Sequence, residues 1–322
     1  MPPTTEERTA RASLTRLFDP GDIIGQALVA EHGAVDALKI ATGAHPVRPF
    51  GDVSKDQLTE ALKRWASCVH DLAPEKDLAT IQRLGGGFLV PGDEYWPTAV
   101  DELTDVPWGL WYRGGIDRGI PSPDRAVALT GSRDSTSYGA SVAGDMGYSL
   151  AQRGICVIAG LSYGVDALAA RAALAGSQGP GPATIAVTAG GLDRDYPAGN
   201  ADLAAAIRSQ GLTVSELPPE SAPTRHRFLH RNRIIAALAG VTCVVEARWR
   251  SGALNTAHHA RELGRGVGAV PGSIHSANSA GCHRILKENA ATLVTDAEDL
   301  VQMLADRTQP LMAPVRTKEV NA

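Results

Sequence analysis

The residues of this 322-residue chain best suited to chemistry are arginines gathered in one stretch around an aromatic ring. Between Arg225 and Arg265 there are eight arginines but only two acidic residues, Glu246 and Glu262, although the whole chain has a net charge of −4. Guanidinium groups bind phosphate oxygens, and a ring such as Phe228 can stack on an unpaired base. Local positive charge of this kind indicates a nucleic-acid site.

Most of these side chains fall at the start of a predicted helix, in the letters RHRFLHRNRII. One helical turn separates the phenylalanine from an arginine and an asparagine, so ring, guanidinium and amide can face one groove. Because only unpaired bases offer a free face, this combination favours single-stranded over duplex nucleic acid. In the alternative, the ring belongs to the core and one arginine, most readily Arg233, pairs internally with Asp166 or Glu246. The candidate contacts in this stretch are Arg225, Arg227, Phe228, Arg231 and Asn232.

A turn further up the chain could bind a phosphate as well. Gly131, Ser132 and Arg133 directly follow an apolar run and precede a helix that should begin near Ser137. Backbone N–H groups, the serine hydroxyl and the helix N-terminus would then converge on one anion. The alternative is an ordinary turn with a surface arginine.

A second turn, at Ser251 and Gly252, offers another helix N-terminus to an anion. A purely structural turn in which Ser251 caps the helix would explain the same residues. Arg265, at the end of the basic stretch, is the last candidate contact. Trp249, between two arginines, could stack on a base if it is exposed.

Short apolar runs alternate with Ala- and Leu-rich segments of helical length. The runs cover residues 126–130, 156–159, 184–188, 212–214, 241–246 and 268–270. Strands buried on both faces have this composition, and their alternation with helices is typical of right-handed βαβ crossovers. The predicted fold class is therefore α/β, an extended Rossmann-like, doubly wound, mostly parallel sheet. Ligands of such sheets lie beyond the carboxyl ends of the strands, where the candidate contacts also fall.

Residues 1–82 predict a small N-terminal helical domain. Asp22 is placed to cap a helix that Gly33 should end, and a second helix should cover residues 55–72. Such a domain could serve as a spacer or as an auxiliary nucleic-acid binder, and the residues leave both open. The aromatic, turn-rich stretch that follows, residues 88–111, should contain strands that lead into the main sheet.

The main domain is expected to span residues 83–305, with a last helix at about 296–304. Residues 306–322 are polar and contain prolines, so we expect a disordered tail there. No run approaches the roughly 20 apolar residues of a membrane span, and the N-terminus has no apolar secretion signal. We therefore expect a cytoplasmic protein that does not bind membranes.

Several kinds of chemistry find no matching pattern in the chain. The four cysteines are scattered, so thiols are expected rather than disulfides or metal ligands. There is no H-E-x-x-H pattern, no G-x-S-x-G elbow and no dinucleotide fingerprint after the first strand. The sequence therefore predicts no cofactor, no metal and no catalytic residues.

The order of several short motifs resembles that of the DNA-processing protein A family, DprA/Smf. The pattern F-x-x-R-N-R-I-I begins at Phe228 and is followed by V-E-A and S-G-A-L-x-T-A. Before it come G-S-R at Gly131, A-G-L at Ala159, G-V-D, then G-G-L-D at Gly190, Y-P and S-E, while P-G at Pro271 comes after it. The resemblance covers roughly residues 83–292.

This resemblance implies that Arg225, Phe228, Arg231 and Asn232 form a pocket for single-stranded DNA. It also implies a SAM-like or helix-hairpin N-terminal domain that assists nucleic-acid contacts. The expected protein is not an enzyme but a mediator that helps load the RecA recombinase during natural transformation or recombination, acting as a homodimer. Many members of the family carry a C-terminal winged-helix domain, for which this sequence leaves no room.

The rival interpretation is a nucleotide-binding sensor or a nucleoside-phosphate hydrolase of a related Rossmann fold. Such hydrolases carry P-G-G-x-G-T-x-x-E with a catalytic glutamate, whereas Pro271 and Gly272 are followed here by Ser-Ile-His.

Overall fold

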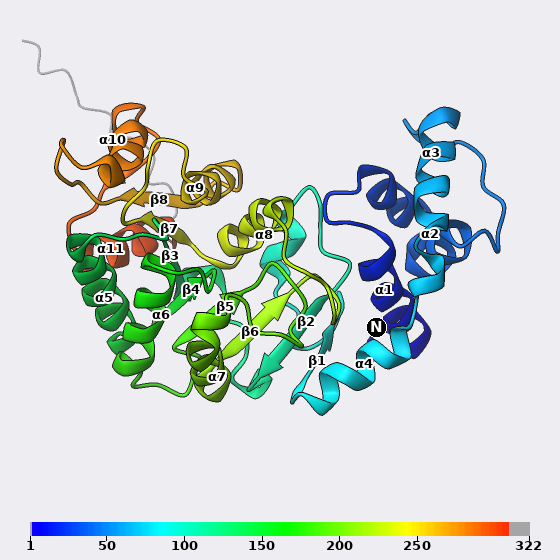
Figure 1. The fold of residues 1–322 in the computed structure, drawn as a ribbon, viewed down its shortest axis with the longest axis horizontal. Helices are drawn as coiled ribbons and strands as arrows, with labels where there is room; N and C mark the ends of the chain where they lie inside the picture. The colour runs from blue at the N-terminus through cyan, green and yellow to red at the C-terminus, as the bar shows by residue number, and fades with distance from the viewer. Residues whose placement is uncertain (1, 309–322) are drawn as a thin grey trace, which may run out of the picture.

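A nine-stranded sheet forms the centre of the computed structural model, which describes residues 2–308 (Figure 1). The strand order is β1-β2-β6-β5-β4-β3-β7-β8-β9. The strands β1 (Gly86–Leu89) and β2 (Leu110–Gly114) are antiparallel to each other, and β2 is antiparallel to β6; all other neighbours are parallel. The predicted α/β fold with a mostly parallel sheet is confirmed.

The parallel strands coincide with the apolar runs of the sequence, and β3 to β7 are buried at every position. Their bounds are β3 (Ala126–Thr130), β4 (Cys156–Ala159), β5 (Thr184–Val187), β6 (Leu212–Ser215), β7 (Val241–Val244), β8 (Gly266–Ala269) and β9 (Thr292–Leu293). The strand β8 begins two residues before the apolar run, because glycines in it have no apolar side chain to signal a strand. A Cβ at Gly268 would lie 2.6 Å from Val294, so a larger residue does not fit there.

Helices cover both faces of the sheet (Figure 1). On one face, Val127 and Leu129 of β3 share a core with α5 (Ser137–Gln152), α6 (Val165–Gly176) and α11 (Ala297–Thr308). The helix α7 (Ala201–Gln210) packs with α6 on this side. On the other face, α8 (Arg225–Leu238) packs on β3 to β6, and beside it lie α9 (Ala253–Glu262) and α10 (Ala280–Lys287).

The connection through α8 reverses the strand order. From β3 the chain adds β4, β5 and β6 on one side, and it then returns through α8 to add β7 on the other side of β3. The loops after β3, β4 and β7 therefore meet the start of α8 at one point of the carboxyl edge. In open α/β sheets such a switch point is where ligands bind.

Four helices gather at the β1 end of the sheet (Figure 1). They are α1 (Thr5–Leu17), α2 (Ile23–Ala41), α3 (Lys55–Ala66) and α4 (Pro74–Arg83). Asp22 caps α2 as predicted, because its carboxylate accepts the N–H of Gly25 at 3.1 Å. Gly33, at φ 75° and ψ 165°, is not helical and ends the first segment of α2 as predicted, and a second helical segment follows it directly as far as Ala41. The helix predicted over 55–72 ends at Ala66, and a single 3-10 turn follows at Val69–Asp71.

These N-terminal helices share buried surface with the sheet. Ala12 of α1 and Ile81 of α4 pack against Phe88 and Trp111 of the first two strands. Arg8 reinforces the contact, because its guanidinium donates to the carbonyl oxygen of Phe88 at 2.7 Å.

The helix α11 continues to Thr308, so residues 306–308 of the expected tail are helical; the rest of that tail lies outside the described residues. Between residues 2 and 308, no helix combines the length and the apolar character that crossing a membrane requires. All four cysteines are free thiols.

Candidate nucleic-acid groove

A groove of about 820 Å³ lies at the switch point, between the loops after β3, β4 and β7 and the first turns of α8. We call it the basic groove. Its charged lining residues are Arg133, Asp134, Asp166, Arg225, Arg231, Arg248 and Arg250. Nine of the eleven candidate contacts line it, and Arg227 and Arg265 do not. The fold thus brings residues from three loops and the start of α8 to one surface.

Three arginines of the basic groove have no carboxylate partner among the described residues. Arg225 and Arg250 are exposed, and within residues 2–308 the guanidinium group of neither forms a hydrogen bond or an ion pair. Arg133 is also exposed, with its Cζ atom 4.8 Å from the ring centroid of Phe228. An exposed guanidinium that no carboxylate neutralises keeps its full capacity to bind a phosphate.

Arg231 forms the floor of the groove and is buried. Its Nη1 donates to the carbonyl oxygens of Gly160, at 2.8 Å, and Val187. Asp166 is buried close by and accepts the hydroxyl of Thr130 at 3.1 Å. Burial lowers the pKa of Arg231 to about 10, and burial raises the pKa of Asp166 despite the positive charge of Arg231. Arg231 is therefore engaged with the protein, unlike the free guanidinium group that the sequence suggested.

Asn232 is also engaged internally. Its Nδ2 donates to the carbonyl oxygen of Gly252 at 3.2 Å and to Oδ1 of Asn255 at 3.1 Å. Its Oδ1 accepts the Nε–H of Arg231 at 3.3 Å. The amide therefore ties α8 to α9, while Asn232 also lines the groove, and its contact with a ligand stays a prediction.

The N-terminus of α5 does not offer the anion seat expected after Gly131. The carboxylate of Glu246 accepts the N–H of Thr136 at 2.9 Å and its hydroxyl at 2.6 Å. A Cβ at Gly139 would lie 2.3 Å from that carboxylate, so the two groups are in close contact. The hydroxyl of Ser132 donates to Asp134 at 2.6 Å. The protein's own carboxylates thus occupy the positions that the sequence assigned to a phosphate.

At the start of α9, too, acceptors of the protein itself bind the N–H groups of the first residues. The hydroxyl of Ser251 accepts the N–H of Ala253 at 3.3 Å, and its carbonyl oxygen accepts the N–H of Leu254 at 3.2 Å. Gly252 likewise accepts the N–H of Asn255 at 3.1 Å. The turn thus bonds its own N–H groups, as a structural turn does, but the N-cap of α9 is Gly252 and not Ser251, and both residues line the groove.

The two remaining candidate contacts lie elsewhere. Arg227 turns toward the N-terminal helices, where Nη2 lies 3.2 Å from the carboxylate of Asp19. Arg265 precedes β8, at the opposite edge of the sheet, and its Nη2 lies 2.8 Å from Glu102. Neither arginine lines the basic groove, so this geometry gives no support to the prediction that they bind the same strand. Both arginines belong to the basic stretch of the sequence. Arg227 lies on α8 and Arg265 lies just before β8, so the two side chains reach different surfaces.

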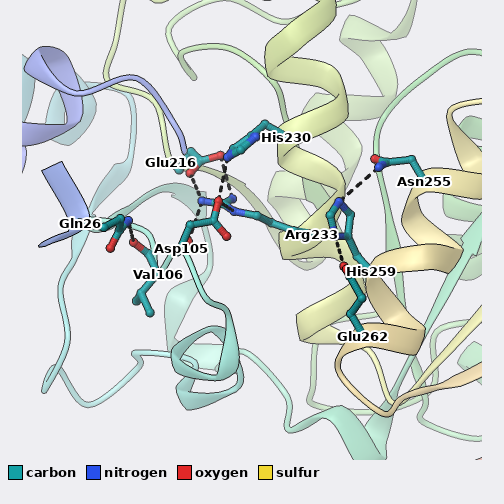
Figure 2. Close-up of polar contacts among 9 residues, drawn as sticks. All are labelled: Gln26, Asp105, Val106, Glu216, His230, Arg233, Asn255, His259 and Glu262. Carbon is teal, nitrogen blue, oxygen red and sulfur yellow. Dashed lines mark hydrogen bonds and ion pairs between the residues drawn. The ribbon is translucent and has the colours of Figure 1, made fainter. Parts of the chain in front are cut away.

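Figure 2 shows how Arg233 is enclosed by acidic groups on the far side of α8. Its Nε donates to Asp105 at 2.7 Å, and its Nη2 donates to Glu216 at 2.7 Å. His230, one turn earlier, lies 2.8 Å from the same Asp105 oxygen. Burial alone would lower the pKa of Arg233, but the two carboxylates raise it. The alternative of an internally paired Arg233 is realised with these partners instead of Asp166 or Glu246.

Aromatic rings gather beside the free arginines. Phe228 lines the groove instead of the core, and Arg231 lies under it with Cζ 5.7 Å from the ring centroid. Tyr196, 52% exposed, places its ring centroid 5.8 Å from that of Phe228. Tyr196 entered the sequence analysis only as the first letter of the Y-P motif, and Arg250 was not predicted as a site residue. The R-W-R letters directly before Ser251 were the available signal for Arg250.

The part of the chain that the structure describes contains no group of three or more His, Cys, Asp or Glu side chains arranged to hold a metal ion.

Comparison with known proteins places most of the chain in one family. The family model described as DNA recombination-mediator protein A matches residues 87–305. A Mycobacterium tuberculosis protein that carries the name putative DNA processing protein DprA is 39% identical over 288 residues, which cover 86% of this chain and 72% of that protein. DNA processing protein DprA of Bacillus subtilis is 30% identical, over 81% of this chain and 86% of the relative.

Solved structures give the same result. The X-ray structure of DNA processing protein A from Streptococcus pneumoniae superposes with a TM-score of 0.72 at 29% identity and covers 94% of this chain and 98% of that one. A structure of DNA processing protein A from Helicobacter pylori, described by its single-stranded DNA binding mode, has a TM-score of 0.59 at 26% identity, over 67% of this chain and 95% of that one. With these matches in sequence and fold, the chain belongs to the DNA recombination-mediator protein A family, DprA/Smf.

Proposed function

We propose that this chain binds single-stranded DNA in the basic groove. Arg133, Arg225 and Arg250 bind successive phosphates, and Phe228 stacks on a base. The observation that carries the proposal is the convergence of three guanidinium groups without carboxylate partners around one aromatic ring, at the switch point of the sheet. The Helicobacter pylori relative, whose structure is described by its single-stranded DNA binding mode, supports the same ligand.

Arg133 and Phe228 act as one unit in this proposal. Without DNA the guanidinium lies over the ring, 4.8 Å from its centroid, which shields the ring from water. When a strand enters, the exposed guanidinium turns to a phosphate and a base takes its place on the ring. Duplex DNA cannot make the second contact, because its bases are stacked on one another.

We further propose that the protein acts by binding, without catalysing a reaction on the strand. Its relatives carry the name DNA processing protein, and the family is described as a recombination mediator. In this role the protein acts as a homodimer and helps load the RecA recombinase on the bound strand. RecA filament formation on a strand already coated by single-strand binding protein should then accelerate when this protein is added.

The test of the groove is the salt dependence of binding to a labelled oligo-thymidine. Three neutralised phosphates predict a slope of log K against log salt near −2, because each contributes about −0.7 on a single strand. Replacing Arg133, Arg225 or Arg250 by alanine should weaken binding and reduce the slope by about 0.7 each. Arg261→Ala is the matched control, since Arg261 is an exposed arginine at the far end of α9, outside the groove.

Equal losses in Arg261→Ala and in the three groove variants would contradict the proposed groove, because net charge alone would then explain binding. No binding of the oligonucleotide by the intact chain would contradict the function itself. Turnover of a nucleoside monophosphate under the same conditions would favour the hydrolase interpretation.

A further inference from the structure

One tryptophan stands apart from the others. Trp249, in the loop between β7 and α9, is 56% exposed, whereas Trp65, Trp96, Trp108 and Trp111 are buried. Single exposed apolar side chains are common on proteins, so exposure alone assigns no role. The surroundings of the indole are what distinguish it.

Arg284 of α10 holds the indole in one orientation. Its Cζ lies 4.9 Å from the ring centroid, and its Nη1 donates to the carbonyl oxygen of Trp249 at 3.0 Å. The guanidinium therefore stacks on part of the ring while a hydrogen bond fixes the backbone beneath it. The residue as a whole stays 56% exposed to solvent. A ring fixed in this way loses little conformational freedom when a ligand stacks on it.

Trp249 is next to the basic groove in the chain. Its two neighbours, Arg248 and Arg250, both line that groove, whereas the indole itself packs on Arg284 outside the lining. Phe228 lines the groove from α8. A strand that continues past Arg250 can therefore reach a second ring beyond the groove.

We propose that Trp249 is a second stacking platform, which takes a base of the strand bound in the basic groove and extends the bound length of DNA toward α10. This inference rests on the proposed single-strand function. A base satisfies both features of the surface, because it has an aromatic face for the indole and is linked to phosphates for the arginines. Asp134 pairs with Arg248 at 2.5 Å, and Glu288 lies 4.0 Å from Nε of Arg284, so Arg250 supplies the free positive charge next to the ring.

Tryptophan emission gives a direct test, because Trp249 is the one exposed tryptophan among the residues that the structure describes. The intact protein is titrated with oligo-thymidines from about 3 to about 12 nucleotides. We expect emission to fall only with strands long enough to reach from the groove to the indole. Trp249→Ala should bind those longer strands about tenfold more weakly, bind the shortest ones as before, and lose the emission change. Trp249→Phe should keep most of the affinity, because a phenyl ring still stacks.

Equal affinity of Trp249→Ala and the intact protein at every length, with no emission change on binding, would overturn the second platform and leave the groove in place. Weakening of the shortest strands by the same factor would also overturn it, since the indole would then belong to the groove. If the intact protein binds no strand of any length, the proposed function fails instead.

Discussion

Arginines that look alike in the sequence have different roles, and the position of carboxylates decides which. Arg225 and Arg250 keep free guanidinium groups, whereas Arg231 and Arg233, on the same helix as Arg225, are buried. A buried guanidinium needs compensation, which backbone carbonyls and Asp166 provide for Arg231. The two classes should respond differently to substitution, one through binding and the other through stability.

Arg231→Met should destabilise the fold by about 3 kcal/mol or more, because it leaves the buried Asp166 without a compensating charge. The effect should depend on pH. The pKa of Asp166 is raised in the folded state, so its charge adds no penalty below its ordinary pKa of about 4, and the penalty grows as pH rises. Loss of Arg231 raises that pKa further. Urea unfolding should therefore show a larger destabilisation at about pH 8 than at about pH 5.

The matched control is the double variant Arg231→Met with Asp166→Asn. Removing both charges should recover part of the lost stability at about pH 8 and abolish the difference between the two pH values. A destabilisation of Arg231→Met that is equal at both pH values would show that lost packing, and not the charge of Asp166, causes it.

For single residues, the sequence could predict that arginines and an aromatic ring lie near one another, but not which arginines lack a carboxylate partner. The basic stretch correctly drew attention to Arg225 and Phe228. The carboxylates that neutralise Arg227, Arg233 and Arg265 come from distant segments: Asp19, Glu102, Asp105 and Glu216. Residues far apart in the chain leave no periodic pattern, so their pairing could not be predicted from spacing.

At the scale of elements, local patterns were better guides. Strands buried on both faces produce apolar runs that are recognisable without knowing their neighbours, and six of them were predicted in the correct order. The prediction failed where tertiary contacts decide, as at the N-terminus of α5. A helix N-terminus attracts any anion nearby, and here the carboxylate of Glu246, just after β7, already accepts hydrogen bonds from the N–H and the hydroxyl of Thr136.

Glu246→Ala should therefore destabilise the fold by about 2 kcal/mol, because the N–H and the hydroxyl of Thr136 lose a charged acceptor in a buried place. Urea unfolding measures the change, and the midpoint should fall without a change in slope. Glu246→Gln is the control, since its amide oxygen can still accept one of the two hydrogen bonds and should retain part of the stability. Full stability of Glu246→Ala would mean that water replaces the carboxylate at no cost.

At the scale of the whole molecule, charge and packing are distributed unevenly. The chain carries a net charge of −4, yet five arginines and only two aspartates line the groove. A polyanion is thus attracted to one place and repelled by the rest of the surface, which favours a single binding mode over general coating of DNA.

The N-terminal helices are joined to the sheet domain by polar contacts as well. Arg16 of α1 lies 2.5 Å from Asp77 of α4 and donates to the carbonyl oxygen of Pro219, in the loop before α8.

This shared packing predicts that the N-terminal helices and the sheet unfold together. Ile81 of α4 is fully buried against Phe88 and Trp111, so Ile81→Ala should cost about 3 kcal/mol. Because the lost contact joins the helices to the sheet, the thermal transition should shift to lower temperature as one step. Far-UV circular dichroism, which reports all helices, and the fluorescence of the buried tryptophans should give the same midpoint in the intact protein and in the variant. Two separate midpoints in the intact protein would mean that the helices form an independent folding unit, and that the core around Trp111 does not couple them to the groove.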